Sequence, residues 1–175
     1  TLATDAIVNA ANSQMLGCWV PGHHCIDNAI HTYAGIQLRK VCADLMAQQG
    51  FPEPTGHAKI TPAFNLPSGY VIHTVGPIVQ GRLTQQHKEL LASCYRSCLT
   101  LAVENGCKSV DFPSISTGVY GYPMAQAAHI ALMVLVDFWR KHPEMELRMV
   151  CHSPEALRVY QVDWNMYYQE TKPQH

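Results

Sequence analysis

The sequence predicts an α/β fold, in which helices cover the faces of a mixed or parallel sheet. Short apolar runs typical of buried strands alternate with longer segments whose apolar residues recur at helical spacing, and small-residue loops follow two of the runs. With 175 residues, 47% of them apolar and 14% charged, the chain can build one sizeable hydrophobic core but is too short for two domains with cores of that size. We therefore expect residues 1–175 to form a single domain.

A strand, a loop and a helix are expected at the start of the chain. Residues 5–10 are an apolar run that ends in small residues, which fits a buried parallel strand. A loop at 12–26 separates this strand from a pattern of helical spacing that continues from Ile30 to Leu45. Because Asp27 stands where an N-cap or first-turn acid belongs, we expect the helix to begin there.

Two strands and a second long helix are expected next. The glycines and prolines of residues 50–56 indicate a turn, and segments 57–64 and 69–75 have strand character with a short turn between them. Residues 84–104 carry apolar side chains at helical spacing. Gly106 suits the left-handed cap that commonly ends a helix.

The last part of the chain repeats the alternation of strands and helices. Residues 109–113 predict a strand, 114–123 a second loop of small residues, and 124–139 a strongly apolar helix. Residues 147–152 predict a final strand. The helix at 154–168 begins with a proline after a serine, which is typical of a capped first turn.

Composition excludes several classes of protein. The net charge is −1 without a basic block, which argues against a nucleic-acid-binding protein. No apolar run approaches the roughly 18 residues that a membrane span requires. The seven cysteines are an odd number and indicate a reducing, cytoplasmic location rather than a disulfide framework. Five of them lie in helix or strand patterns and are expected to act as small buried hydrophobes: Cys42, Cys94, Cys98, Cys107 and Cys151.

The first loop contains a candidate metal site with the spacing C-x4-H-x-C, formed by Cys18, His23 and Cys25. Two thiolates and an imidazole suit tetrahedral Zn²⁺, and three protein ligands leave a fourth position for water or substrate. His24 is an alternative ligand, but spacing favours His23. Two other hypotheses are a loop with incidental cysteines and a redox pair of Cys18 and Cys25.

The second loop, residues 114–123, contains glycines and hydroxyl side chains before a helix. Backbone N–H groups in such a loop can form a concave anion site suited to a diphosphate, although an ordinary tight turn would have the same composition. Tyr120 and Tyr122 could flank a sugar or simply pack. Because loops 12–26 and 114–123 both follow strands, we expect them to meet at one sheet edge and share one site.

Four stretches of the chain together resemble the macrodomain family. They are DAIVNAANS at 5–13, CIDNAIH at 25–31, VIHTVGP at 71–77 and SISTGVYGYP at 114–123, in the family's order and approximate spacing. The resemblance implies a three-layer α/β/α fold with a central mixed sheet. It also implies binding of ADP-ribose, which many members hydrolyse from modified proteins.

The first loop resembles the variant found in zinc-containing microbial macrodomains, which are protein ADP-ribose hydrolases. This resemblance implies Zn²⁺ at Cys18, His23 and Cys25. It also implies a mono-ADP-ribosylated protein as substrate, and a lipoyl-carrier protein as a possible partner. No nucleic acid or membrane is expected.

The resemblance further implies roles for individual residues. Ala10 and Asn12 would contact the substrate, Asn12 at the distal ribose, and both Asn12 and Asp27 would act in catalysis. His31 ends the second stretch, where it is either a packed helix residue or a functional one. The residues expected to enclose the diphosphate and distal ribose are Ser116, Thr117, Gly118, Val119 and Tyr120.

One departure from the family lies at the start of the chain. Macrodomains normally carry Gly-Asp-Ile just before the segment that matches Thr1, and that Asp binds the adenine amino group. The sequence therefore predicts an N-terminally shortened domain with an exposed edge strand. The expected function is zinc-dependent hydrolysis of mono-ADP-ribose from proteins. The alternative is a non-catalytic ADP-ribose reader whose zinc only braces the loop.

Overall fold

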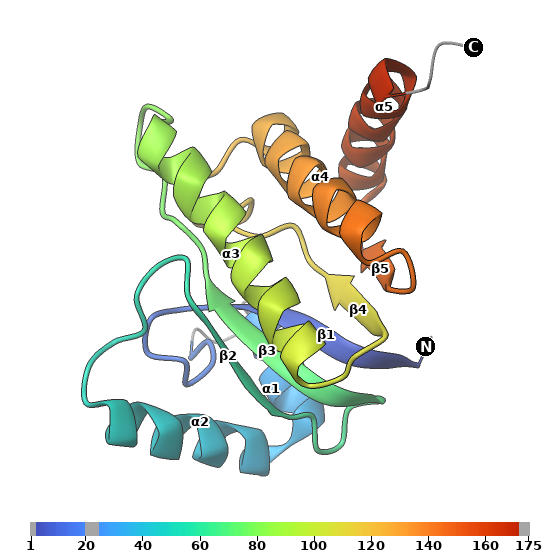
Figure 1. The fold of residues 1–175 in the computed structure, drawn as a ribbon. Coiled ribbons are helices and arrows are strands. Elements are labelled where there is room, and N and C mark those ends of the chain that lie inside the picture. Colours follow the sequence, from blue (N-terminus) through green and yellow to red (C-terminus); the bar gives the residue numbers. More distant parts are fainter. Residues whose placement is uncertain (1–2, 20–24, 172–175) are drawn as a thin grey trace.

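A computed structural model describes residues 3–19 and 25–171 and contains one mixed sheet with helices on both faces (Figure 1). The strands lie in the order β2-β3-β1-β4-β5, and all neighbours are parallel except β2 and β3. The predicted α/β fold is confirmed. The elements are β1 (Thr4–Ala11), α1 (Ile26–Ala34), α2 (Ile36–Gln49), β2 (Ala58–Pro62), β3 (Ser68–Val75), α3 (Gln85–Glu104), β4 (Ser109–Phe112), α4 (Met124–Lys141), β5 (Glu146–Met149) and α5 (Pro154–Thr171).

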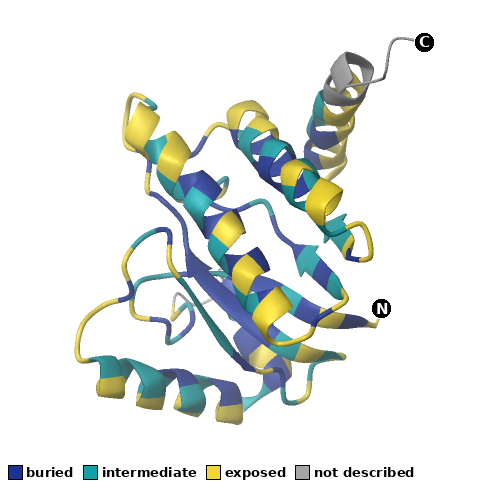
Figure 2. Ribbon diagram, in the orientation of Figure 1, coloured by how far each residue is buried: buried dark blue, intermediate teal, exposed yellow. Residues whose placement is uncertain are grey.

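Two apolar clusters fix the layers of the fold. The larger cluster joins the sheet to α3, α4 and α5, and the smaller one joins it to α1 and α2. Figure 2 shows the buried strands between helices whose outer faces are exposed. Alternation along β1 explains its central place, because Ala6 and Val8 belong to the larger cluster while Ile7 packs against the smaller one. None of the helices described is long and apolar enough to cross a membrane.

The predicted helix beginning at Asp27 is in fact two helices, and the prediction of one continuous helix was wrong. Gly35 separates α1 from α2 with φ +95° and ψ 176°, a conformation that glycine adopts without the steric penalty of a Cβ. The true N-cap is Cys25, whose Sγ accepts a hydrogen bond from Asn28 N at 3.4 Å. Asp27 lies in the first turn, as expected.

The other helix boundaries follow the signals in the sequence. Thr84 caps α3 through a hydrogen bond from His87 N, and Gly106 after this helix has a positive φ of 71°. Ser153 Oγ accepts a hydrogen bond from Ala156 N at 3.1 Å and so caps α5. These local hydrogen bonds satisfy backbone N–H groups that an α-helix leaves unpaired at its start.

A close approach between β3 and the second loop requires a glycine at position 76. A Cβ at Gly76 would overlap Ser116 Oγ and would lie 2.7 Å from Ile115 Cγ2. Ile115 is fully buried, so it has little freedom to move away. Gly76 therefore allows the second loop to lie directly against the end of β3.

We expect Gly76→Ala to lower the free energy of unfolding by about 1–3 kcal/mol, because the added methyl overpacks this contact. Thermal and denaturant unfolding would measure the loss. Gly118→Ala is the matched control, since a Cβ there meets nothing within 4 Å, and it should change stability by less than about 0.5 kcal/mol. Equal losses for the two variants would contradict the packing argument.

Candidate functional site

One cavity of about 620 Å³ lies where the carboxyl ends of β1, β3, β4 and β5 meet. Both loops singled out in the sequence contribute to its wall, as does the start of α1. The sheet topology therefore brings loops 12–26 and 114–123 to one shared site, as predicted from the strand-end rule.

Ten of the eleven predicted site residues line this cavity. His23, together with the alternative ligand His24, lies outside the described residues. Their predicted chemical roles remain predictions, but their gathering around one cavity is a property of the fold. The ten are Ala10, Asn12, Cys18, Cys25, Asp27, Ser116, Thr117, Gly118, Val119 and Tyr120.

Asn12 organises the first loop with its own side chain. Its Oδ1 accepts hydrogen bonds from Gln14 N at 3.0 Å and Met15 N at 3.1 Å, and its Nδ2 donates to Gly17 O at 3.3 Å. One Nδ2 hydrogen remains available for a ligand, because a primary amide carries two. Any contact of Asn12 with a ligand is thus made from a side chain that the loop already holds in place.

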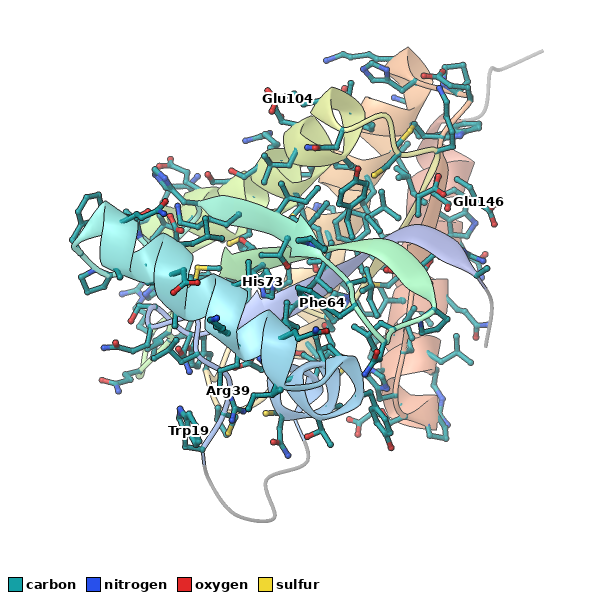
Figure 3. The ribbon with its side chains drawn as sticks, turned by 90° about the horizontal axis from the view of Figure 1, so that it is seen from below. Trp19, Arg39, Phe64, His73, Glu104 and Glu146 are labelled. Carbon is teal, nitrogen blue, oxygen red and sulfur yellow. The ribbon has the colours of Figure 1, made fainter. Side chains whose placement is uncertain are left out.

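Arg39 contacts the middle of the same loop at Trp19. Its guanidinium lies over the Trp19 ring, 4.0 Å from the ring centroid, and Figure 3 shows the two side chains together below α2. Cation–π contacts of this kind stabilise a pair by about 0.5–1 kcal/mol at an exposed site. The loop that leads to Cys18 is therefore anchored on α2.

Asp27 presents a nearly buried carboxyl group to the cavity. The residue is 5% exposed, and its Oδ1 accepts a hydrogen bond from Asn9 Nδ2 at 2.8 Å. Burial raises the pKa of Asp27, while the Asn9 hydrogen bond and the Arg39 guanidinium oppose the rise. The arrangement places one carboxyl group in the same cavity wall as the two candidate metal-binding thiols, close enough to Cys25 for its charge to raise the pKa of that thiol.

His31 is a buried neighbour of Asp27. Its Nε2 lies 3.5 Å from Asp27 Oδ1, and neither ring nitrogen makes a hydrogen bond to any residue that the structure describes. Burial, aided by the Arg39 guanidinium, lowers the pKa of His31 to about 4. His31 is therefore a neutral imidazole at neutral pH. Unlike Asp27, it is not part of the cavity wall.

Cys18 and Cys25 meet at the cavity wall. Burial raises the pKa of the Cys25 thiol, and the hydrogen bond and charge interaction that it shares with the neighbouring Cys18 contribute to the rise. Two adjacent thiols are a donor set that fits a soft or borderline metal ion such as Zn²⁺. The same Cys25 Sγ caps α1, so the local helix start fixes its position.

A second group of metal-ligating atoms lies in the interior, and the sequence pattern did not reveal it. Ligand atoms of His31, Cys42 and His73 all lie within 4.8 Å of one another, so this group could hold a metal ion. The residues come from α1, α2 and β3, and no short motif connects them. Burial raises the pKa of the Cys42 thiol to about 12 and lowers that of His73 to about 3.

The second loop keeps its shape through backbone contacts. Ser116 has a positive φ of 67°, and its carbonyl accepts a hydrogen bond from Tyr122 N at 2.9 Å. Gly118 O accepts a hydrogen bond from Gly121 N at 3.0 Å. Tyr122 is 2% exposed and belongs to the larger core cluster, so it packs rather than flanks the cavity. Tyr120 lines the cavity.

The cavity also has a wall that the sequence motifs did not predict. Cys151, His152 and Ser153 follow β5 and line the cavity. Because β5 runs parallel to β4, the same strand-end rule would have pointed to these residues. Gly76, after β3, is the fourth strand end at the cavity.

Comparisons with known proteins agree with this architecture. A "Protein-ADP-ribose hydrolase" from Treponema medium is 59% identical over 150 residues, which cover 86% of this chain and 57% of the relative. The protein of the same name from Staphylococcus aureus strain MSSA476 is 45% identical over 168 residues, which cover 94% of this chain and 63% of the relative. The chain thus spans about three fifths of the length of these relatives.

Solved structures match over nearly the whole chain. The Oceanobacillus iheyensis macrodomain with ADP has a TM-score of 0.88 and 39% identity, covering 97% of this chain and 87% of that one. The Trypanosoma brucei macrodomain in complex with ADP-ribose has a TM-score of 0.76 and 38% identity, covering 91% of this chain and 63% of that one. The sequence profile of the family described as "Macro domain" matches residues 8–131. The predicted resemblance is confirmed, and the chain belongs to the Macro domain family.

Proposed function

We propose that this domain hydrolyses mono-ADP-ribose from modified proteins. The observation that carries the proposal is the cavity that joins Asn12, Asp27 and the thiol pair to the loop at 116–120. Support also comes from relatives at 59% and 45% identity that are named protein-ADP-ribose hydrolase. None of the cysteines that the structure describes forms a disulfide, in keeping with the proposed cytoplasmic location.

The loop at 116–120 is proposed to bind the diphosphate of ADP-ribose. The loop precedes α4, and a helix start with nearby backbone N–H groups favours an anion. Space is open above Gly118, where a Cβ would meet nothing within 4 Å. A phosphate can therefore approach the backbone closely at this position.

With the diphosphate on this loop, the distal ribose would lie between Asn12 and Asp27. The free Nδ2 hydrogen of Asn12 would donate to a ribose hydroxyl, while Ala10 leaves room beside it. Asp27 would orient the attacking water and accept its proton as the bond to the modified protein breaks. Holding water and sugar in one geometry supplies much of the rate enhancement available to such a site.

We further propose that Cys18 and Cys25, with His23 between them in the sequence, hold Zn²⁺. The adjacent thiols at the cavity wall fit this ion, and as thiolates they would offset its charge. When bound, Zn²⁺ would supply Lewis-acid polarisation and orientation of the sugar. The Cys25 side chain positions the start of α1, so the same residue would link metal binding to the placement of Asp27.

The proposed substrate is a mono-ADP-ribosylated protein, and a lipoyl-carrier protein is a candidate for that partner. A reader that binds ADP-ribose without cleaving it is the competing function. Binding and hydrolysis use almost the same contacts in the cavity. Only measured turnover separates these two functions.

We expect the protein to release ADP-ribose from a mono-ADP-ribosylated carrier protein, and a zinc chelator should abolish this release. Product would be quantified by chromatography, and calorimetry would measure binding of free ADP-ribose in parallel. Binding without release would support the reader instead. Release that a chelator leaves unchanged would contradict the role of the metal.

We expect Asp27→Asn to lower kcat by about 100-fold or more, because the substitution removes the proposed proton acceptor. The affinity for free ADP-ribose should stay within about threefold, since Asn keeps the size of the side chain. Asp137→Asn is the control, because Asp137 is exposed on α4 and its contact with Lys141 is a weak surface ion pair. Full activity of Asp27→Asn would contradict the assignment.

We expect Cys25→Ser to lose bound zinc and turnover, whereas Cys42→Ala should keep one zinc ion. Metal content would be measured after purification under reducing conditions, with Cys107→Ala as a control. Cys107 is buried near the amino end of β4, away from the cavity. Zinc retained by Cys25→Ser but lost by Cys42→Ala would place the metal in the interior group instead.

A further inference from the structure

A chain of buried polar contacts crosses the sheet and ends at Asp27. Thr61 Oγ1 on β2 lies 3.0 Å from His73 Nε2 on β3, and His73 Nδ1 lies 3.1 Å from Asn9 Nδ2 on β1. Asn9 Nδ2 then donates to Asp27 Oδ1 at 2.8 Å. Asn9 and His73 are direct register partners in the parallel pair of β1 and β3. Figure 3 shows His73 between the sheet and α2.

The donors and acceptors available on each side chain determine which group donates in every contact of this series. An ionised carboxylate can only accept, so the Asn9 amide must turn its Nδ2 toward Asp27. The second Nδ2 hydrogen then points to His73 Nδ1, which must be the unprotonated ring nitrogen. The proton of the neutral ring is therefore on Nε2, where Thr61 Oγ1 accepts it. The opposite amide orientation would set Asn9 Oδ1 against the Asp27 carboxylate.

The amide orientation has an unfavourable consequence for the fold. Asn9 is fully buried, and among the described residues its Oδ1 has no hydrogen-bond partner. An unpaired buried acceptor destabilises a protein, and an apolar residue in a buried central strand would avoid it. This arrangement is therefore one that packing alone would not favour. What the arrangement provides is the Nδ2 donor of Asn9, held rigidly against Oδ1 of Asp27.

We infer that Asn9 and His73 are positioning residues that hold Asp27 toward the cavity. This inference rests on the proposed role of Asp27 in hydrolysis. His73 acts through Asn9: its Nδ1 acceptor holds the amide, and the amide holds the carboxylate. Neither residue lines the cavity, so neither touches the substrate.

The inference differs from a metal-binding role for His73. A metal ion in the interior group would need a free lone pair on a His73 nitrogen. The hydrogen bonds described above already engage both ring nitrogens. Cys42 Sγ also lies 3.8 Å from Nε2. The protonation of the ring therefore separates the two roles experimentally.

The variants His73→Asn and His73→Leu form a matched pair for the test. Both remove the ring and the Nε2 contact, but Asn can keep an acceptor oxygen near the position of Nδ1, whereas Leu has only a methyl group there. Release of ADP-ribose from the mono-ADP-ribosylated carrier is measured for both, with calorimetry on free ADP-ribose and thermal unfolding. We expect kcat to be about tenfold or more lower in His73→Leu than in His73→Asn, with the same KM and ADP-ribose affinity. Equal kcat values would overturn the inference, as would a deficit confined to KM.

Asp27→Asn, measured in the same assay, separates this inference from the proposed function. If Asp27→Asn keeps full activity, the role of Asp27 itself is wrong. If Asp27→Asn loses activity while the two His73 variants remain equal, only the positioning role is wrong.

A measurement on the unmodified protein does not depend on whether either variant folds. Two-bond ¹⁵N–¹H correlation spectra identify which nitrogen of His73 carries the proton, with His73→Asn used for assignment where it folds. We expect the neutral Nε2–H form, before and after addition of Zn²⁺. A neutral Nδ1–H form, or a His73 resonance that reports a metal-bound nitrogen, would overturn the inference.

Discussion

The burial of β1 in the middle of the sheet is the constraint on which the rest of the structure depends. Parallel neighbours occupy both edges of this strand, and helices cover both of its faces. A polar side chain in such a strand must find its partners inside the protein. The Nδ2 group of Asn9 finds them in Asp27 and His73, and two residues further on Ala11 already faces the cavity. One strand therefore determines both the interior polar chain and the position of the cavity.

Local pattern made most of the fold predictable from the sequence. Apolar periodicity located the strands and helices, and the rule that ligands gather at strand ends correctly predicted that the two loops meet. The break at Gly35 was missed because the apolar spacing continues across it, and only the backbone conformation reveals the turn. Cys25 was missed as a helix cap because a thiol is an uncommon acceptor at that position.

The pairing register of strands far apart in the sequence explains which parts of the site could not be predicted from the sequence. Many of the residues that line the cavity come from the two loops that the motifs identified, whereas Thr61, His73 and Asn9 meet only because three strands pair in one register. The interior group of His31, Cys42 and His73 is hidden for the same reason. None of these three residues lines the cavity. An ion held there would contact the core, whereas an ion at Cys18 and Cys25 would contact the ligand space.

The cavity wall is assembled from segments that lie far apart in the chain, from Ala10 near the start to Ala156 in α5. In the unfolded chain these segments are separate, so a molecule that fills the cavity binds only the native state. Mass action then raises the free energy of unfolding by about 1.4 kcal/mol for each tenfold rise in ligand above its Kd. Any small molecule that fills the cavity would therefore make the thermal stability of this domain depend on its own concentration as well as on the sequence.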